Sequence, residues 1–225
     1  MVEVRFLGHA ATWIRGEGVD ILIDPFLEGN PMAVLGPDEV EADFILLTHA
    51  HGDHWGDTVK IAKRTGAKVI STFEIATYAA KAGVETWAMN IGGQFQLPGG
   101  RLKFYPAWHS SSFPDGTYGG MPMGVLVELE GKRVYHAGDT ALFSDLRLVG
   151  EEGVHLALLP IGDTFTMGPD DALKALELIR PQGVVPIHYN TFPPIEQDGE
   201  AFAERARALG FEAFALKPGE SLQLE

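Results

Sequence analysis

Apolar and polar positions in the N-terminal third follow strand periodicity. The runs 2–8, 11–16 and 19–24 mix apolar with polar residues, and a Gly16-Glu17-Gly18 turn separates the last two. This arrangement predicts an antiparallel meander. The apolar run 43–48 is typical of a strand buried on both faces. A loop rich in glycine and proline, residues 26–37, precedes it.

The next segment alternates between helical and strand patterns. We expect a short helix over 57–65, a strand over 68–71 and a helix over 74–82 that Gly83 closes. Alternation of this kind indicates an α/β layer. Two further β-runs, 95–97 and 102–105, lead into a loop of serine, glycine and proline over 110–122.

The second half repeats the layout of the first. Runs 123–129 and 133–139, joined by a Gly131 turn, repeat the strand, turn and strand that end at Asp24. Run 155–159 likewise repeats run 44–47, which indicates an internal duplication. Helices over 170–179 and 200–209 flank a strand over 183–187, and a last β-run closes the chain. We expect one domain, 1–225, with two β-rich halves and helices outside.

Composition narrows the function. The chain has 17 Lys and Arg against 31 Asp and Glu, a formal charge of −14, and no cysteine. The charge makes nucleic acid an unfavourable partner, and any bound metal must use His, Asp or Glu. Because no run has the layout of a secretory signal or of a membrane-spanning helix, we expect a cytoplasmic protein that does not bind a membrane.

A cluster of metal-ligand side chains follows the buried run 43–48. His49, His51, Asp53 and His54 lie within six residues. His49 and His51 project to the same side of an extended backbone, and Gly52 permits a turn that brings the other two in from a second direction. Imidazole with carboxylate suits zinc, manganese or iron. The alternative interpretation is a solvated polar loop that binds nothing. Further candidate ligands later in the chain argue against it.

Those partners each follow a β-run. His109 comes after run 102–105, Asp139 ends run 133–139, and His188 follows run 183–187. The three residues therefore occupy equivalent positions at strand ends, where side chains from different strands can converge.

The complete set resembles the signature of the metallo-β-lactamase superfamily, His-x-His-x-Asp-His followed by a His, an Asp and a final His. In this chain the set is His49, His51, Asp53, His54, His109, Asp139 and His188. Within the superfamily, the segments Gly8-His9-Ala10 and 160–168 resemble the corresponding segments of small metal-dependent hydrolases related to ascorbate-6-phosphate lactonase.

The resemblance implies an α+β fold, a four-layer αββα sandwich with two divalent metals at one edge. It implies that His49, His51 and His109 bind the first metal, that Asp53, His54 and His188 bind the second, and that Asp139 bridges them. A bridging carboxylate also offsets the repulsion between two close cations, and their shared water becomes acidic enough to attack as hydroxide. We expect zinc, then manganese, with Asp53 and Asp139 as the catalytic carboxylates.

Other residues are ambiguous. We expect His9 to line the site, and His136 and His155 to be structural. Asp24 and Asp163 are candidate acceptors for ligand imidazoles, or simple turn residues. The four tryptophans are expected in the core, although Trp55 and Trp108 adjoin ligands. Loops 26–37 and 110–122 are expected to form pocket walls, through the residues Phe26, Met32, Ser111, Phe113 and Tyr118.

The leading hypothesis is a binuclear hydrolase that acts on a small-molecule ester, lactone or phosphodiester. An RNA-processing nuclease of the same fold is disfavoured by charge. A non-hydrolytic diiron protein is disfavoured because its relatives carry glutamate where this chain has His51. A metal-binding protein without activity is a further alternative. Self-association is left open.

Overall fold

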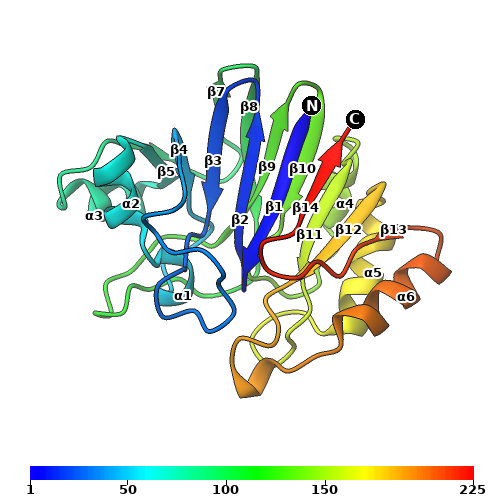
Figure 1. Ribbon diagram of the computed structural model, residues 1–225. Coiled ribbons are helices and arrows are strands. Elements are labelled where there is room, and N and C mark those ends of the chain that lie inside the picture. The colour runs from blue at the N-terminus through cyan, green and yellow to red at the C-terminus, as the bar shows by residue number, and fades with distance from the viewer.

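Two seven-stranded sheets face each other, and helices cover their outer faces, in the computed structural model of residues 1–225 (Figure 1). The first sheet has the order β14 (Ser221–Leu224), β1 (Val2–Gly8), β2 (Ala11–Gly16), β3 (Val19–Ile23), β4 (Phe44–Leu46), β5 (Lys68–Thr72) and β6 (Thr86–Met89). The second has the order β13 (Glu212–Ala213), β12 (Gly183–Ile187), β11 (Leu156–Pro160), β10 (Lys132–His136), β9 (Met123–Leu129), β8 (Gly100–Pro106) and β7 (Gln94–Leu97).

Helices lie on both sides of this sandwich. They are α1 (Gly52–Trp55), α2 (Thr58–Thr65), α3 (Phe73–Ala80), α4 (Leu146–Gly150), α5 (Pro169–Ile179) and α6 (Gly199–Ala208), with a 3₁₀ turn at Pro193–Ile195. In Figure 1, α2 and α3 flank the first sheet, and α4, α5 and α6 flank the second. The αββα architecture of the α+β class is confirmed. No helix has both the length and the apolar character needed to cross a bilayer.

The two sheets repeat one pairing pattern. Strands β1, β2 and β3 are antiparallel, and β4, β5 and β6 then add in parallel. Strands β8, β9 and β10 are likewise antiparallel, followed by parallel β11, β12 and β13. One extra antiparallel strand lies beside each first strand, β14 beside β1 and β7 beside β8. This topology agrees with the duplication that the sequence indicates.

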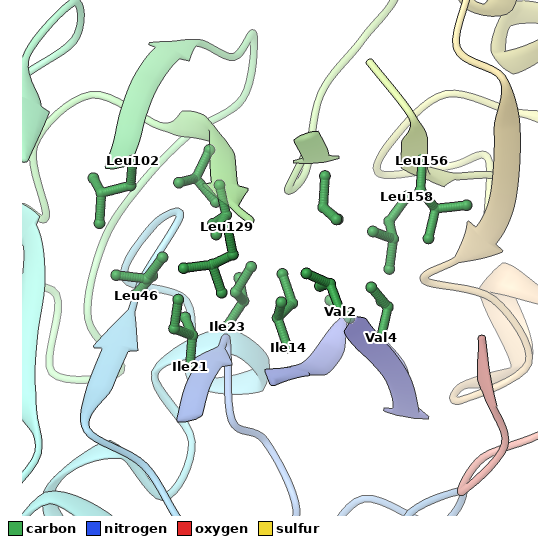
Figure 2. Close-up of a cluster of buried hydrophobic side chains, with 14 of the residues drawn as sticks. Val2, Val4, Ile14, Ile21, Ile23, Leu46, Leu102, Leu129, Leu156 and Leu158 are labelled. Atoms are coloured by element: carbon green, nitrogen blue, oxygen red, sulfur yellow. The ribbon is translucent and has the colours of Figure 1, made fainter. Parts of the chain in front are cut away.

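Strand alternation builds the central core. Val2, Val4 and Ile14 point inward from the first sheet and meet Leu102, Leu129 and Leu156 of the second (Figure 2). This layer contains 23 buried residues, and each fully buried aliphatic side chain contributes about 1.5–3 kcal/mol. Clusters of 17 and 21 residues fill the spaces between each sheet and its helices.

Several predicted boundaries shift, and some elements were not predicted. Helix α3 spans Phe73–Ala80, earlier than predicted, because the Thr72 hydroxyl accepts the amide of Ile75 at 3.2 Å and caps it. The sequence analysis missed α1, α4, β6 and β13. Strand β6 has two exposed residues at its centre, so it lacks the alternation that marks a half-buried strand.

The pairing directions place one end of several strands at a common edge. Strands β1, β3 and β4 run in the same direction, as do β8, β10 and β12. The amide of His188, after β12, donates to the carbonyl of His9, after β1, at 2.7 Å, so the two sheets meet at this edge. Both chain termini lie at the other end of the sandwich from α1 (Figure 1).

Candidate metal centre

Three imidazoles form the first cluster at the common edge. Ligand atoms of His49, His51 and His109 lie within 4.8 Å of one another. Their ring planes are nearly perpendicular, with interplanar angles of 79–86° and centroids 4.6–5.1 Å apart. Rings arranged in this way aim their nitrogens at one point from three directions, which suits a tetrahedral metal with an open fourth position.

A second cluster lies beside the first. His9, Asp53, His54 and His188 bring ligand atoms within 4.8 Å of one another. Two of the groups thus contain the two sets of three ligands that the resemblance implies, with His9 added to the second set. A third group, Asp24, His49 and His54, connects the two clusters.

Asp139 lies between the clusters and is almost fully buried. Its Oδ2 is 3.0 Å from His188 Nε2 and 3.5 Å from His109 Nε2, and its Oδ1 is 3.3 Å from His54 Nε2. Asp139 Oδ1, His54 Nε2 and both ring nitrogens of His188 have no hydrogen-bond partner. Buried polar atoms are normally satisfied, so this concentration of orphaned ligand atoms fits metal binding.

The electrostatics of the clusters favour a cation. Burial opposes the charged form of His54, yet Asp139 and Asp24 raise its pKa well above the ordinary value. Burial also opposes the charged form of Asp139, and His188 and His54 lower its pKa well below the ordinary value. Burial lowers the pKa of His49, which favours the neutral imidazole that metals require. Positive charge is therefore stabilised between the carboxylates.

Asp24 orients His54 directly and His49 through Thr48. Its carboxylate accepts the Nδ1 hydrogen of His54 at 2.8 Å, and it also accepts the Thr48 hydroxyl at 2.6 Å and the Thr48 amide at 2.8 Å. Because the Thr48 hydroxyl donates to Asp24, it accepts the Nδ1 hydrogen of His49 at 3.0 Å. Both rings are thus held in the tautomer whose Nε2 carries no proton and can bind a metal. His49 Nε2 lies 3.0 Å from Nδ1 of His51, another candidate ligand.

His9 supports the second cluster in a similar way. Its Nε2 donates to Asp53 Oδ2 at 3.1 Å, and its Nδ1 accepts the hydroxyl of Thr191 at 2.8 Å. Its ring also packs on that of His188 with centroids 4.0 Å apart. Burial lowers the pKa of His9 to about 4, so the ring is neutral at neutral pH.

The remaining polar candidates lie outside the clusters. His136 is buried, and its Nε2 donates to the carbonyl of Ala10 at 2.8 Å. His155 precedes β11, at the end of the second sheet opposite to the two clusters. Its Nδ1 accepts the amide hydrogen of Arg133. Asp163 is exposed, and its carboxylate accepts no hydrogen bond from a histidine.

The loops that were expected to form pocket walls divide into two kinds. Phe113 is 2% exposed and stacks on Tyr78 at a centroid distance of 3.6 Å. It is a core residue, so its assignment to a pocket wall is wrong. Ser111 is also buried and accepts the amide of Ala50. Phe26, in contrast, packs edge-on against His9, and Tyr118 is exposed.

The expectation that the tryptophans are core residues is wrong for two of them. Trp108 is 67% exposed and Trp87 is 49% exposed. Trp108 adjoins His109 at the metal edge, where a strand has ended and neither sheet nor helix covers the side chain.

The sequence analysis also missed the backbone geometry and the hydroxyl partners. His9, Asp24 and His188 follow strand ends with positive φ, between 48° and 59°. Such strain gathers at functional sites because the surrounding structure enforces it. Thr48 and Thr191 bond to site histidines, and the position of Thr48 directly before His49 was an available signal.

These observations define the class of protein: a metallo-β-lactamase fold with a histidine and aspartate metal centre at the edge of two sheets. A family model described as a beta-lactamase superfamily domain matches residues 20–189. The chain belongs to that family.

Comparison with relatives narrows the class to metal-dependent hydrolases. A UPF0173 metal-dependent hydrolase of Thermus thermophilus is 70% identical over 225 residues, the full length of both chains. A Methanopyrus kandleri protein of the same description is 51% identical over 229 residues, covering 99% of this chain and all of that one. A metallo hydrolase from Ignicoccus hospitalis superposes with a TM-score of 0.92 at 39% identity, covering 100% of this chain and 98% of that one. This chain is a metal-dependent hydrolase.

Proposed function

We propose that this chain is a binuclear hydrolase whose two metals are held by the clusters at the sheet edge. His49, His51 and His109 would hold one metal, and Asp53, His54 and His188 the other. The observation that carries the proposal is Asp139, a buried carboxylate between the two groups with an unpartnered oxygen. Zinc is the metal that this donor set suits best, followed by manganese.

The residues have distinct tasks in such a centre. Bound metals would supply Lewis acidity and a water acidic enough to act as a nucleophile at neutral pH. Asp139 offsets the repulsion between two cations, Asp24 keeps His54 and His49 in the correct tautomer, and His9 holds the carboxylate of Asp53. Pre-arranged ligands of this kind need little reorganisation during the reaction.

Exposure indicates the side from which substrate arrives. The Asp53 and His109 side chains are 29% and 13% exposed, whereas those of His49 and His54 are fully buried. His51 is half-buried, and its Nε2 is 3.4 Å from the hydroxyl of Ser110. Substrate therefore approaches over His51, His109 and Asp53, and the proposed class is a small ester, lactone or phosphodiester.

The test combines metal content with turnover. Metal-free protein is reconstituted with zinc or manganese, its metal content is measured by elemental analysis, and generic esters, lactones, phosphodiesters and β-lactams are assayed. We expect two metals per chain and turnover that a chelator abolishes. Absence of bound metal after reconstitution, or absence of turnover with every metal and substrate, would contradict the proposal.

A further inference from the structure

No lysine or arginine lies in the loops that surround the two clusters of candidate metal ligands. We define these rim loops as residues 9–10, 24–33, 47–57, 107–122, 137–145, 161–168 and 188–198. All 17 cationic side chains of the protein lie elsewhere. The rim loops instead contain ten Asp and Glu side chains, among them Asp24, Asp53 and Asp139.

Three of the cations that approach the rim from outside are already paired. Lys60 lies 3.5 Å from Glu28 and 3.3 Å from Asp38. Lys174 and Arg205 line a hollow beside Asp163, but they pair with Asp171 at 2.8 Å and with Asp170 at 2.6 Å. Lys217 has no ion pair, but it lines a hollow with Glu196 and Asp198 to which none of the seven candidate ligands contributes. The rim loops themselves therefore offer no ammonium or guanidinium group to bind a substrate phosphate or carboxylate.

Metal binding does not reverse this charge balance. Two divalent cations bring four positive charges, of which Asp24, Asp53 and Asp139 offset three. The other rim carboxylates then leave the entrance negative. A field of this sign repels anionic substrates and attracts cationic ones, and such steering changes association rates by about 10–10³-fold.

The rim loops also expose two aromatic side chains. Trp108 and Phe165 are 67% and 55% exposed. Both belong to loops held by Thr140, the residue after Asp139. Its hydroxyl accepts the amide of Trp108 at 3.0 Å, and its carbonyl accepts the amide of Met167 at 2.9 Å. Exposed aromatic faces bind apolar groups and, through the ring quadrupole, cationic groups.

We infer that the substrate is an ester or lactone without negative charge, which presents an apolar or cationic group to Trp108 and Phe165. This inference rests on the proposed hydrolase function and narrows it, because it removes phosphodiesters and phosphorylated lactones from the substrate class. Two independent features carry it: the absence of cations from the rim loops, and the two exposed aromatic side chains in loops that bond to Thr140.

The test uses three 4-nitrophenyl esters of equal length, whose acyl chains end in a methyl, a trimethylammonium or a carboxylate group. With metal-loaded protein, kcat/KM for the carboxylate ester should be at least about 10-fold below that of the other two. Added salt should lower kcat/KM for the cationic ester and raise it for the anionic one. Equal kcat/KM for all three esters would overturn the inference.

Variants locate the effect at the rim. Phe165→Lys should raise kcat/KM for the anionic ester several-fold. Leu209→Lys, at a similarly exposed position directly after the C-terminal end of α6, should not. Trp108→Ala should raise KM for the neutral ester with little change in kcat. If Phe165→Lys and Leu209→Lys behave alike and Trp108→Ala changes only the association state, the aromatic pair belongs to an interface and the inference is wrong.

A binding measurement separates this inference from the proposed function. The corresponding amides, which resist cleavage, are titrated into metal-loaded protein by calorimetry. If none of the esters, lactones, phosphodiesters and β-lactams is hydrolysed, the proposed function fails, and amide binding still tests the charge preference. Weaker binding of the carboxylate amide supports the inference, and equal or tighter binding contradicts it.

Discussion

The two halves of the sandwich place an aspartate at the same topological position but in opposite environments. Asp24 follows β3 and Asp139 follows β10, the third strand of each repeated unit. Asp24 is fully buried and saturated by Thr48 and His54, whereas Asp139 is equally buried but has an unpartnered oxygen among four histidines. In the proposed centre, the first position supports the ligands and the second bridges the two metals.

The difference shows that the two halves of a duplicated fold can supply ligands to one site in different ways. The first half supplies four candidate ligands from a single segment after β4, the last two of them on α1, and Asp24 bonds to one of these, His54. The second half supplies one ligand after each of β8, β10 and β12. The comparison predicts that the two aspartates respond differently to the same substitution, and the predictions below are ordered by expected effect.

Asp139→Asn should have the largest effect, because it keeps the size of the side chain but removes the charge that two cations would share in the proposed centre. We expect kcat/KM to fall by at least about 10³-fold, a loss on the scale of one essential electrostatic group. Steady-state kinetics on the best ester or lactone, with matched metal loading, measure it. Turnover within a few-fold of wild type would refute the bridging role.

Asp24→Asn should weaken the metal centre without removing it. Asparagine tolerates the φ of +48° but cannot accept hydrogen bonds at both former oxygens, so His54 or Thr48 loses its partner. Loss of such supporting partners typically lowers metal affinity by about 10–100-fold. Competition with a zinc-binding dye measures the affinity. An effect as large as that of Asp139→Asn would erase the distinction between support and bridge.

His9→Phe should have a smaller effect that is specific to the second cluster. The ring can keep its packing on His188 but loses the hydrogen bond to Asp53. We expect about 10-fold weaker binding of one metal, while the other is unchanged. His136→Phe is the matched control, since that buried histidine bonds only to the backbone. Equal losses of metal affinity in both variants would mean that His9 acts through stability alone.

The smallest expected effect is on stability, and it concerns a polar cluster in the second half that contains none of the candidate metal ligands. Glu152 pairs with Arg101 and Lys103 and accepts the hydroxyl of Tyr105. Burial opposes its charged form, but these partners lower its pKa from 4.5 to about 2. Its stabilisation is therefore complete above pH 4.5 and is lost as the pH falls through about 2.

Glu152→Gln should therefore lower the free energy of unfolding at neutral pH by about 1 kcal/mol, after allowance for solvent screening. The difference from wild type should disappear under acid conditions. Urea denaturation across pH measures it, with the exposed neighbour variant Glu151→Gln as the control. A pH-independent difference would show that the ion pairs are not its source.

The sequence predicted most of the strands and the complete set of seven candidate ligands, because both leave local signals. Alternating apolar residues define strands one by one, and the spacing of His49, His51, Asp53 and His54 is unusual in itself. The later ligands were found because each follows a predicted strand. Their grouping into two clusters, however, came from the resemblance and not from spacing.

The rest depends on contacts between distant residues. Nothing local shows that Phe113 stacks on Tyr78 or that Trp108 remains exposed beside His109. The bond from His9 to Asp53 joins residues 44 positions apart. Asp24-Pro25 was open to interpretation as a turn, and only the fold shows that the turn conformation aims its carboxylate at His54.

The most direct test of the account is to locate the metals. Crystals of zinc-loaded protein, measured at the zinc absorption edge, should show two anomalous peaks per chain about 3.5–4 Å apart, with Asp139 between them. One peak should lie in the cluster of His49, His51 and His109, and the other in that of Asp53, His54 and His188. A single peak at full loading, or two peaks that do not share Asp139, would contradict the binuclear centre.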